Sequence, residues 1–233
     1  MGPAARGSAR PIVEANRAPA PAPGGRKRRV DGEITWRRVL DAAVDSILEN
    51  GYYHTSSNEI ARRAGVTWGT IQYQFGTREG LLLEVLNDRW RRLDERLASA
   101  EVSGSTLEAR LHSVLDVLAS HYAQPEHLVQ LQILLDLSRN PTTSAETRSA
   151  VARHGERLIR AWQPLFEHAL GEAAREPDLV RYAFLTLRGH LTGDLISGSI
   201  SDVPSDPALH DLLVRAVAAA VREEAERPGL SVS

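Results

Sequence analysis

The 233-residue sequence contains no cysteine, which excludes disulfide bonds, thiolate nucleophiles and zinc sites built on cysteine. It also lacks a long hydrophobic run. The most apolar stretch, residues 128–137, is interrupted by Gln130, Gln132 and Asp136 and is too short to span a bilayer. The first residues carry no apolar segment of the kind that a signal peptide requires. We therefore expect a cytoplasmic protein with no membrane partner.

Alternating polar and apolar residues, which would indicate strands, are missing, and apolar residues recur with helical spacing instead. The sequence also lacks a nucleophile elbow, a phosphate-binding glycine loop and a paired-histidine zinc helix. His190 and Asp194 lie one helical turn apart, but two metal ligands without further partners are weak support for a metal site. These absences predict an all-α protein that is not an enzyme and uses no metal or cofactor.

Charge is distributed unevenly along the chain although the net charge is only −2. Residues 1–92 hold 15 Lys and Arg against 10 Asp and Glu, whereas the remainder holds 13 against 20. A positive front on an acidic body suggests that the front meets a polyanion, although chance clustering would give the same pattern.

The chain is expected to begin with a disordered tail over residues 1–30, because the prolines and glycines of 19–25 cannot build a packed element. The basic run 26–29 is either an arm that enters the minor groove or a solvated charge run. Beyond the tail we expect a helix-turn-helix DNA-binding domain at 31–78, an effector-binding and dimerisation domain at 79–228, and a short tail at 229–233.

Periodicity and breakers together predict about nine helices. The expected spans are about 35–50, 57–64, 68–75, a longer helix after Thr77, 105–122, 125–139, 143–171 with an irregularity at Pro164, 177–198 and 206–226.

Residues 56–75 carry the most specific pattern, in which two short helices are joined by a turn that contains Gly65. Ser56 three residues before Glu59 matches a capping box, where hydroxyl and carboxylate each bond a free backbone N–H. Thr67 can cap the second helix. We expect the common core of the two helices to contain Ile60, Ala61, Ala64, Val66, Ile71 and Phe75. The second helix would then present Trp68, Gly69, Thr70, Gln72, Tyr73 and Gln74 toward a major groove.

The stretch from Val39 to Leu86 resembles the TetR family of transcriptional regulators, and the similarity is dense over about a fifth of the chain. The matching segments are Leu40-Asp41-Ala42-Ala43, Asn50-Gly51-Tyr52, Glu59-Ile60-Ala61, Ala64-Gly65-Val66-Thr67, Gly69-Thr70-Ile71, Tyr73-Gln74-Phe75 and Thr77-Arg78-Glu79-Gly80-Leu81. The resemblance implies a homodimer of nine-helix subunits in which three N-terminal helices bind DNA, a fourth connects, and the others form the ligand and dimer domain.

Position by position, the resemblance implies roles for eight side chains at a double-stranded DNA operator. It assigns phosphate contacts to Thr55, Thr67, Tyr73 and Arg78, and base contacts to Trp68, Thr70, Gln72 and Gln74. Hydroxyls suit phosphate oxygens, and glutamine can pair with adenine. Trp68 and Gln72 stand where the family often has lysine and tyrosine, which leaves the operator sequence open. Trp68 could instead pack on the core, and Tyr73 could be a core residue with a solvated hydroxyl.

A dimer interface is expected near the C-terminus. Gly189, Gly193 and Ser197 recur every four residues and make a flat helical ridge, which Leu213 and Val217 of the last helix could match. The resemblance implies that the last two helices of each subunit form a four-helix interface. Close packing of the ridge within one subunit is the alternative.

An effector pocket for a small, largely apolar ligand of unknown identity is expected among the central helices. Its candidate residues are His121, Tyr122, Gln132, Leu135, Trp162, Phe166, Phe184 and Arg188. Each of them could instead be an ordinary core or surface residue.

Together these observations predict a repressor that a ligand releases from a palindromic operator. A ligand-dependent activator, or a helical interaction module derived from such a regulator, remain the alternatives.

Overall fold

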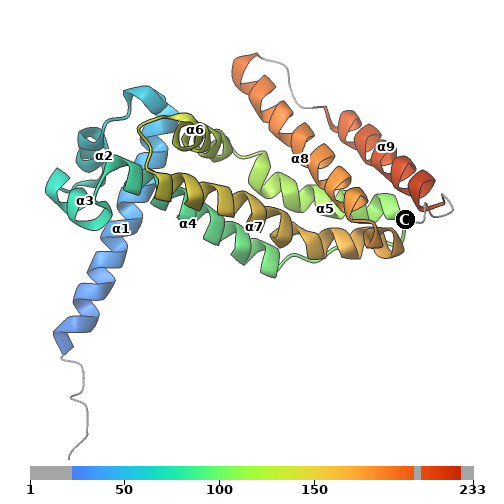
Figure 1. Ribbon diagram of the computed structural model, residues 1–233, viewed down its shortest axis with the longest axis horizontal. Coiled ribbons are helices and arrows are strands. Elements are labelled where there is room, and N and C mark those ends of the chain that lie inside the picture. Colours follow the sequence, from blue (N-terminus) through green and yellow to red (C-terminus); the bar gives the residue numbers. More distant parts are fainter. Residues whose placement is uncertain (1–22, 202–205, 227–233) are drawn as a thin grey trace, which may run out of the picture.

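The computed structural model describes residues 23–201 and 206–226 of the chain. All regular elements within these ranges are helical, which confirms the all-α prediction (Figure 1). None of the helices described is both long and apolar enough to cross a bilayer. The elements are α1 (Pro23–Asn50), η1 (Tyr52–His54), α2 (Ser57–Ala64), α3 (Trp68–Phe75), α4 (Arg78–Ala98), α5 (Leu107–Tyr122), α6 (Pro125–Arg139), α7 (Ala145–Leu170), η2 (Gly171–Arg175), α8 (Pro177–Ile200) and α9 (Pro207–Ala225).

The first helix begins earlier than predicted, and the expected tail over residues 1–30 is wrong for its last part. α1 starts at Pro23, whereas the periodicity predicted a start near Thr35. A proline at the first helical position loses nothing, because its missing N–H would have no partner there, and the arginines and lysine that follow are good helix formers. Residues 1–22 and the predicted tail at 229–233 lie outside the described residues.

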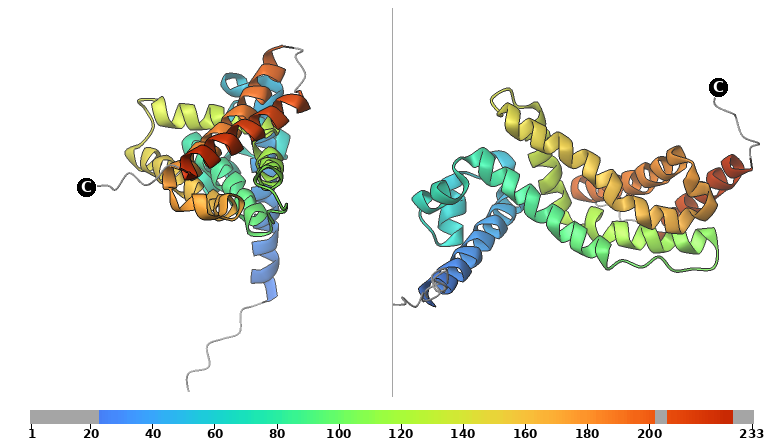
Figure 2. Two further views of the ribbon diagram at one scale, coloured as in Figure 1. Left: turned by 90° about the vertical axis from the view of Figure 1, so that its right-hand side faces the viewer. Right: turned by 60° about the horizontal axis from the view of Figure 1, so that its bottom comes forward.

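The helices form an elongated body with the DNA-binding motif at one end. α1, α2 and α3 gather at that end, and α8 and α9 lie at the other (Figures 1 and 2). α4 and α7 pack against each other and run between the two ends. α7 continues through Pro164, which cannot donate the backbone hydrogen bond that would reach the carbonyl of Arg160.

Two hydrophobic cores hold this body together. The first joins α1–α3 to the first half of α4 and to Val129, Ile133 and Leu137 of α6. The second joins the end of α4 to α5, α7, α8 and α9. The first core contains residues from both sides of the expected domain boundary between residues 78 and 79. The core therefore does not separate the two predicted domains, and their division stays a prediction.

Candidate nucleic-acid interface

Local hydrogen bonds fix α2, the turn and α3. The Ser56 hydroxyl accepts from the Glu59 N–H at 3.2 Å and caps α2 as predicted. The other half of the expected capping box differs, because the Glu59 carboxylate accepts two hydrogen bonds from Arg62. Gly65 ends α2 in the left-handed region at φ 65°, and Thr67 caps the first turn of α3. The predicted roles of Ser56, Gly65 and Thr67 at the helix ends are confirmed.

The inner faces of α2 and α3 are apolar and closed, as predicted. Ile60, Ala61, Ala64 and Ile71 are buried, and Val66 and Phe75 are partly buried against them. This packing decides which side chains of α3 turn outward.

The most exposed large side chains on the outer face of α3 are Gln72 and Tyr73. Tyr73 is 92% exposed, so the alternative that it belongs to the core is wrong. Thr70 and Gln74 are half-buried. Trp68 is also half-buried and packs against the first core, as the packing alternative expected. Gln72 and Tyr73 are therefore the side chains best exposed toward a groove or its phosphates.

The structure corrects one expected phosphate contact, Thr55, and shows that another, Arg78, binds neighbouring carbonyls. Thr55 is only 2% exposed, and its hydroxyl donates to the Gly51 carbonyl and lies 3.2 Å from the Ser46 hydroxyl. The Arg78 guanidinium donates to the carbonyls of Tyr52 and Thr55 at 3.3 and 3.2 Å and lies over the Tyr52 ring. Both side chains hold η1 between α1 and α4, with Thr55 closed to solvent and Arg78 half-buried. Tertiary contacts, which a sequence motif does not encode, cause the difference.

Two polar links between the DNA-binding motif and the rest of the body were missed by sequence reasoning. The Tyr52 hydroxyl donates to Asp136 at 2.6 Å, and the Ser144 hydroxyl donates to Glu79 at 2.7 Å. Hydrogen bonds from Thr147 and Ser144 lower the pKa of Glu79. No local signal could have revealed these pairs, because the partners are 84 and 65 residues apart.

The basic residues of α2 are partly neutralised by neighbouring carboxylates. Arg62 pairs with Glu59 and Arg63 with Glu49, each at 2.7 Å. The hydrogen bond from Arg63 lowers the pKa of Glu49, and the one from Arg62 lowers the pKa of Glu59. The side chain of Arg62 is 72% exposed, whereas that of Arg63 is only 23% exposed. An exposed pair contributes little, so Arg62 can exchange Glu59 for another anion at small cost.

The predicted effector residues divide into two groups. Tyr122, Trp162, Phe166 and Phe184 are buried in the second core in successive ring contacts of about 6 Å. The Arg188 guanidinium lies over the rings of Tyr122 and Phe184. Tyr122, Trp162, Phe166 and Phe184 are core residues, which was the alternative for each of them.

The other group, His121, Gln132 and Leu135, lies outside the second core. His121 borders a separate polar cavity of about 310 Å³, and burial lowers its pKa to about 3. Gln132 and Leu135 are exposed on the outer face of α6, beside η1, and not in a central pocket. α6 buries Ile133 and Leu137, so Leu135, two residues from each, is turned to the opposite side. Their placement in a central pocket was wrong.

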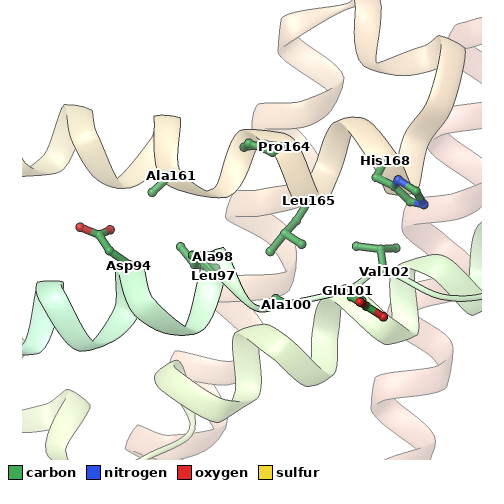
Figure 3. A pocket seen from close by; sticks show the side chains of 10 residues that line it. All are labelled: Asp94, Leu97, Ala98, Ala100, Glu101, Val102, Ala161, Pro164, Leu165 and His168. Carbon is green, nitrogen blue, oxygen red and sulfur yellow. The ribbon is translucent and has the colours of Figure 1, made fainter.

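A cavity with a volume of about 710 Å³ lies between the end of α4, the chain that follows it, and α7. Figure 3 shows Leu165 reaching from α7 toward Leu97 of α4. The polar side chains of the lining are Asp94, Glu101 and His168. None of the eight predicted effector residues lines this cavity. Its volume is in the range of small-molecule sites.

The small-residue ridge of α8 faces outward. Gly189, Gly193 and Ser197 are exposed, and no atom lies within 4 Å of where a side chain at either glycine would begin. The alternative that the ridge packs inside one subunit is therefore wrong. The ridge is available to a second chain.

The matching residues on α9 are corrected. Val217 is fully buried, and Leu213 is half-buried against the second core. α9 is amphipathic, and its inward stripe already includes Val217. The exposed apolar side chains of α9 are instead Leu209 and Leu212.

An all-α body that joins an N-terminal helix-turn-helix to a cavity-bearing helical domain defines the class of ligand-responsive DNA-binding regulators. Residues 39–85 match the family model described as bacterial regulatory proteins, tetR family. The regulator BetI of Cronobacter sakazakii is 30% identical over 145 residues, which cover 54% of this chain and 71% of BetI. The chain belongs to the TetR family of transcriptional regulators.

Another relative is matched over a shorter stretch. The fatty acid metabolism regulator protein of Bacillus subtilis is 31% identical over 80 residues, which cover 34% of this chain and 41% of that protein. This alignment therefore spans less than half of the Bacillus regulator.

Solved structures agree in fold. A transcriptional regulator from Rhodococcus sp. Rha1 has a TM-score of 0.60 at 19% identity, covering 81% of this chain and 96% of that one. FadR from Bacillus subtilis, in complex with stearoyl-CoA, has a TM-score of 0.55 at 20% identity, covering 80% and 97%. The relatives are transcriptional regulators and not enzymes.

Proposed function

We propose that this chain is a homodimeric repressor that leaves a palindromic operator when an apolar ligand occupies the cavity between α4 and α7. The Gln72 and Tyr73 face of α3 would contact the operator, with support from the Thr67 hydroxyl. The predicted roles of Thr70, Gln74 and the half-exposed edge of Trp68 are secondary in this proposal, because these side chains are less accessible.

One observation carries the proposal: α4 is both a wall of the cavity and the support of α3. Leu97 lines the cavity at one end of α4. At the other end Gly80 lies directly against the Phe75 carbonyl, where even a methyl group would be only 2.2 Å from that oxygen. A displacement of α4 by a ligand therefore moves α3 and changes the spacing of the two recognition helices.

The chemistry of the cavity limits the ligand class. Leu97, Val102 and Leu165 suit an apolar chain. Asp94 and Glu101 disfavour an anionic head group, so a neutral or cationic amphiphile fits better than a fatty acyl thioester of coenzyme A, the ligand class bound by Bacillus subtilis FadR. The ligand of this chain would then differ in its head group from the stearoyl-CoA bound by FadR.

Duplexes selected from random DNA with the full chain would provide the operator, and fluorescence anisotropy would measure its affinity. A coupling of about 1–3 kcal/mol predicts that a suitable amphiphile weakens binding about 5- to 150-fold. Ala161→Trp, which fills the cavity, should keep operator binding and lose this response. Ala152→Trp on the exposed face of α7 is the matched control. Selection of no sequence would overturn the proposal, and tighter binding with ligand would indicate a ligand-dependent activator.

The dimer would form through the outer faces of α8 and α9. The exposed residues on these faces are Tyr182, Leu185, Gly189, Gly193, Ile196, Ile200, Leu209 and Leu212. Gly193→Arg should give monomers in sedimentation experiments and lose operator affinity, because two half-sites must be read together. Gly155→Arg on α7 also adds a charge at an exposed glycine and should leave the dimer intact. A Gly193→Arg dimer would contradict this interface.

A further inference from the structure

Three side chains with metal-binding atoms converge where α8 meets α9. His190 and Asp194 lie one turn apart on α8, and His210 comes from the first turn of α9. The Nε2 atoms of His190 and His210 lie 3.6 and 3.4 Å from the same Asp194 carboxylate oxygen. The candidate ligand atoms all lie within 4.8 Å of one another.

Hydrogen bonds between Asp194 and the two histidines account poorly for these separations. A charge-assisted N–H···O bond is about 2.7–2.9 Å long, shorter than both separations. The Nε2 atoms of His190 and His210 are buried without a hydrogen-bond partner. A tetrahedral zinc ion with bonds of about 2.0–2.1 Å instead holds its ligand atoms about 3.3–3.4 Å apart. The His210–Asp194 separation of 3.4 Å matches that spacing, and the His190–Asp194 separation of 3.6 Å is about 0.2 Å longer.

We propose that His190, Asp194 and His210 bind one divalent transition-metal ion of the zinc type. Two imidazole nitrogens and one carboxylate suit Zn²⁺, whereas Mg²⁺ and Ca²⁺ prefer sites made of oxygen ligands. The three side chains leave a fourth coordination position for water. His190 and Asp194 alone were too few ligands to predict a site from sequence, and the fold supplies the third.

Bound metal would cross-link α8 to α9. An ion that binds the folded chain and not the unfolded one stabilises the fold by mass action. Because His210 belongs to the first turn of α9, the ion would fix this end of the helix against α8. This inference does not depend on the proposed repressor function, since metal binding is measured without DNA or effector.

The full chain, without an affinity tag and stripped with a chelator, should be titrated with ZnCl2 by calorimetry and with CoCl2 by visible spectroscopy. We expect one ion per chain, the absorption of tetrahedral cobalt, and a rise in the unfolding temperature on zinc addition. His210→Ala and the milder Asp194→Asn should each weaken binding at least about tenfold. Circular dichroism would check that both variants stay folded.

His112 provides a matched control. Its Nε2 atom lies 3.3 Å from Asp211, so this pair also joins a histidine to an aspartate across two helices, but no third ligand joins it among the residues that the structure describes. His112→Ala should bind zinc like the parent chain. A parent chain that binds no zinc or cobalt would overturn the proposal. So would zinc binding that His210→Ala and Asp194→Asn leave unchanged, because the ion would then sit elsewhere.

Discussion

The Tyr52 hydroxyl donates a hydrogen bond to Asp136 at 2.6 Å and so joins the segment before the helix-turn-helix to α6. Burial, and then the bond to Asp136, raises the pKa of Tyr52 to about 12, so the phenol stays protonated and remains a donor throughout the neutral range. Arg78 at the start of α4 lies over the same ring. Tyr52 is thus shared by α4, which lines the cavity, and α6.

Tyr52→Phe should lower the free energy of unfolding by about 1–2 kcal/mol, because the partly buried Asp136 carboxylate loses its 2.6 Å donor and keeps the longer 3.4 Å bond from Asn140. It should also reduce the effect of a ligand on operator affinity. Urea unfolding and anisotropy measure the two effects. Tyr53→Phe removes the same hydroxyl from a neighbour that is 90% exposed, and it should change neither quantity. Equal losses from both variants would refute the role of the link.

Tyr73 and Arg78 should separate DNA contact from stability. Tyr73→Ala should leave the free energy of unfolding within about 0.5 kcal/mol of the parent value, since the side chain is 92% exposed, yet weaken operator binding. Arg78→Ala should cost about 1.5–3 kcal/mol of stability, because its charged hydrogen bonds to η1 are lost. Tyr53→Ala controls for the loss of an exposed ring outside α3. A stable Arg78→Ala protein that has lost only DNA binding would restore the phosphate role.

Much of the DNA-binding motif could be predicted from sequence because its signals are local. Ser56, Gly65 and Thr67 act on backbone groups within a few residues, so spacing alone reveals them. The inner face of the helix pair follows from periodicity for the same reason.

The side chains whose predicted roles were wrong or incomplete depend on how separate elements of the fold pack together. Thr55 and Arg78 occupy family positions, but their hydrogen bonds are set by how α1, η1 and α4 meet. Val217 and Leu135 were assigned to the wrong faces because the apolar residues of α9 and α6 alone do not say which side meets the core. His210 was missed because its cluster partners are on another helix.

Gly80→Ala should destabilise the chain by about 1–3 kcal/mol, the usual range for overpacking, because its methyl group would collide with the Phe75 carbonyl. Gly155→Ala is the matched control, since this helical glycine has open space around it. Alanine there should stabilise by about 0.5–1 kcal/mol through its better helix propensity. Thermal unfolding of the two variants should therefore move in opposite directions. A neutral Gly80→Ala would show that α3 and α4 can separate at little cost.

Acid should destabilise the fold through two half-buried histidines, His121 and His154. Burial, and then His127, lowers the pKa of His121 from 6.5 to about 3, and burial, and then Arg157, lowers that of His154 to the same value. The His154 ring also stacks on Trp90. In the unfolded chain both imidazoles take up protons below about pH 6.5, while the folded chain keeps them neutral until about pH 3. The free energy of unfolding therefore decreases as the pH falls from about 6.5 to about 3.

Each histidine should lower the free energy of unfolding by up to about 1.4 kcal/mol per pH unit between these limits. His154→Phe keeps a ring on Trp90 and removes the titration, so its stability should fall less steeply than that of the parent between pH 6 and about 4. Urea unfolding at a series of pH values, with chelator present, measures the slopes, and carboxylate contributions cancel in the comparison. Identical slopes for His154→Phe and the parent would mean that His154 takes up its proton without unfolding, and that its contact with Trp90 opens readily to water.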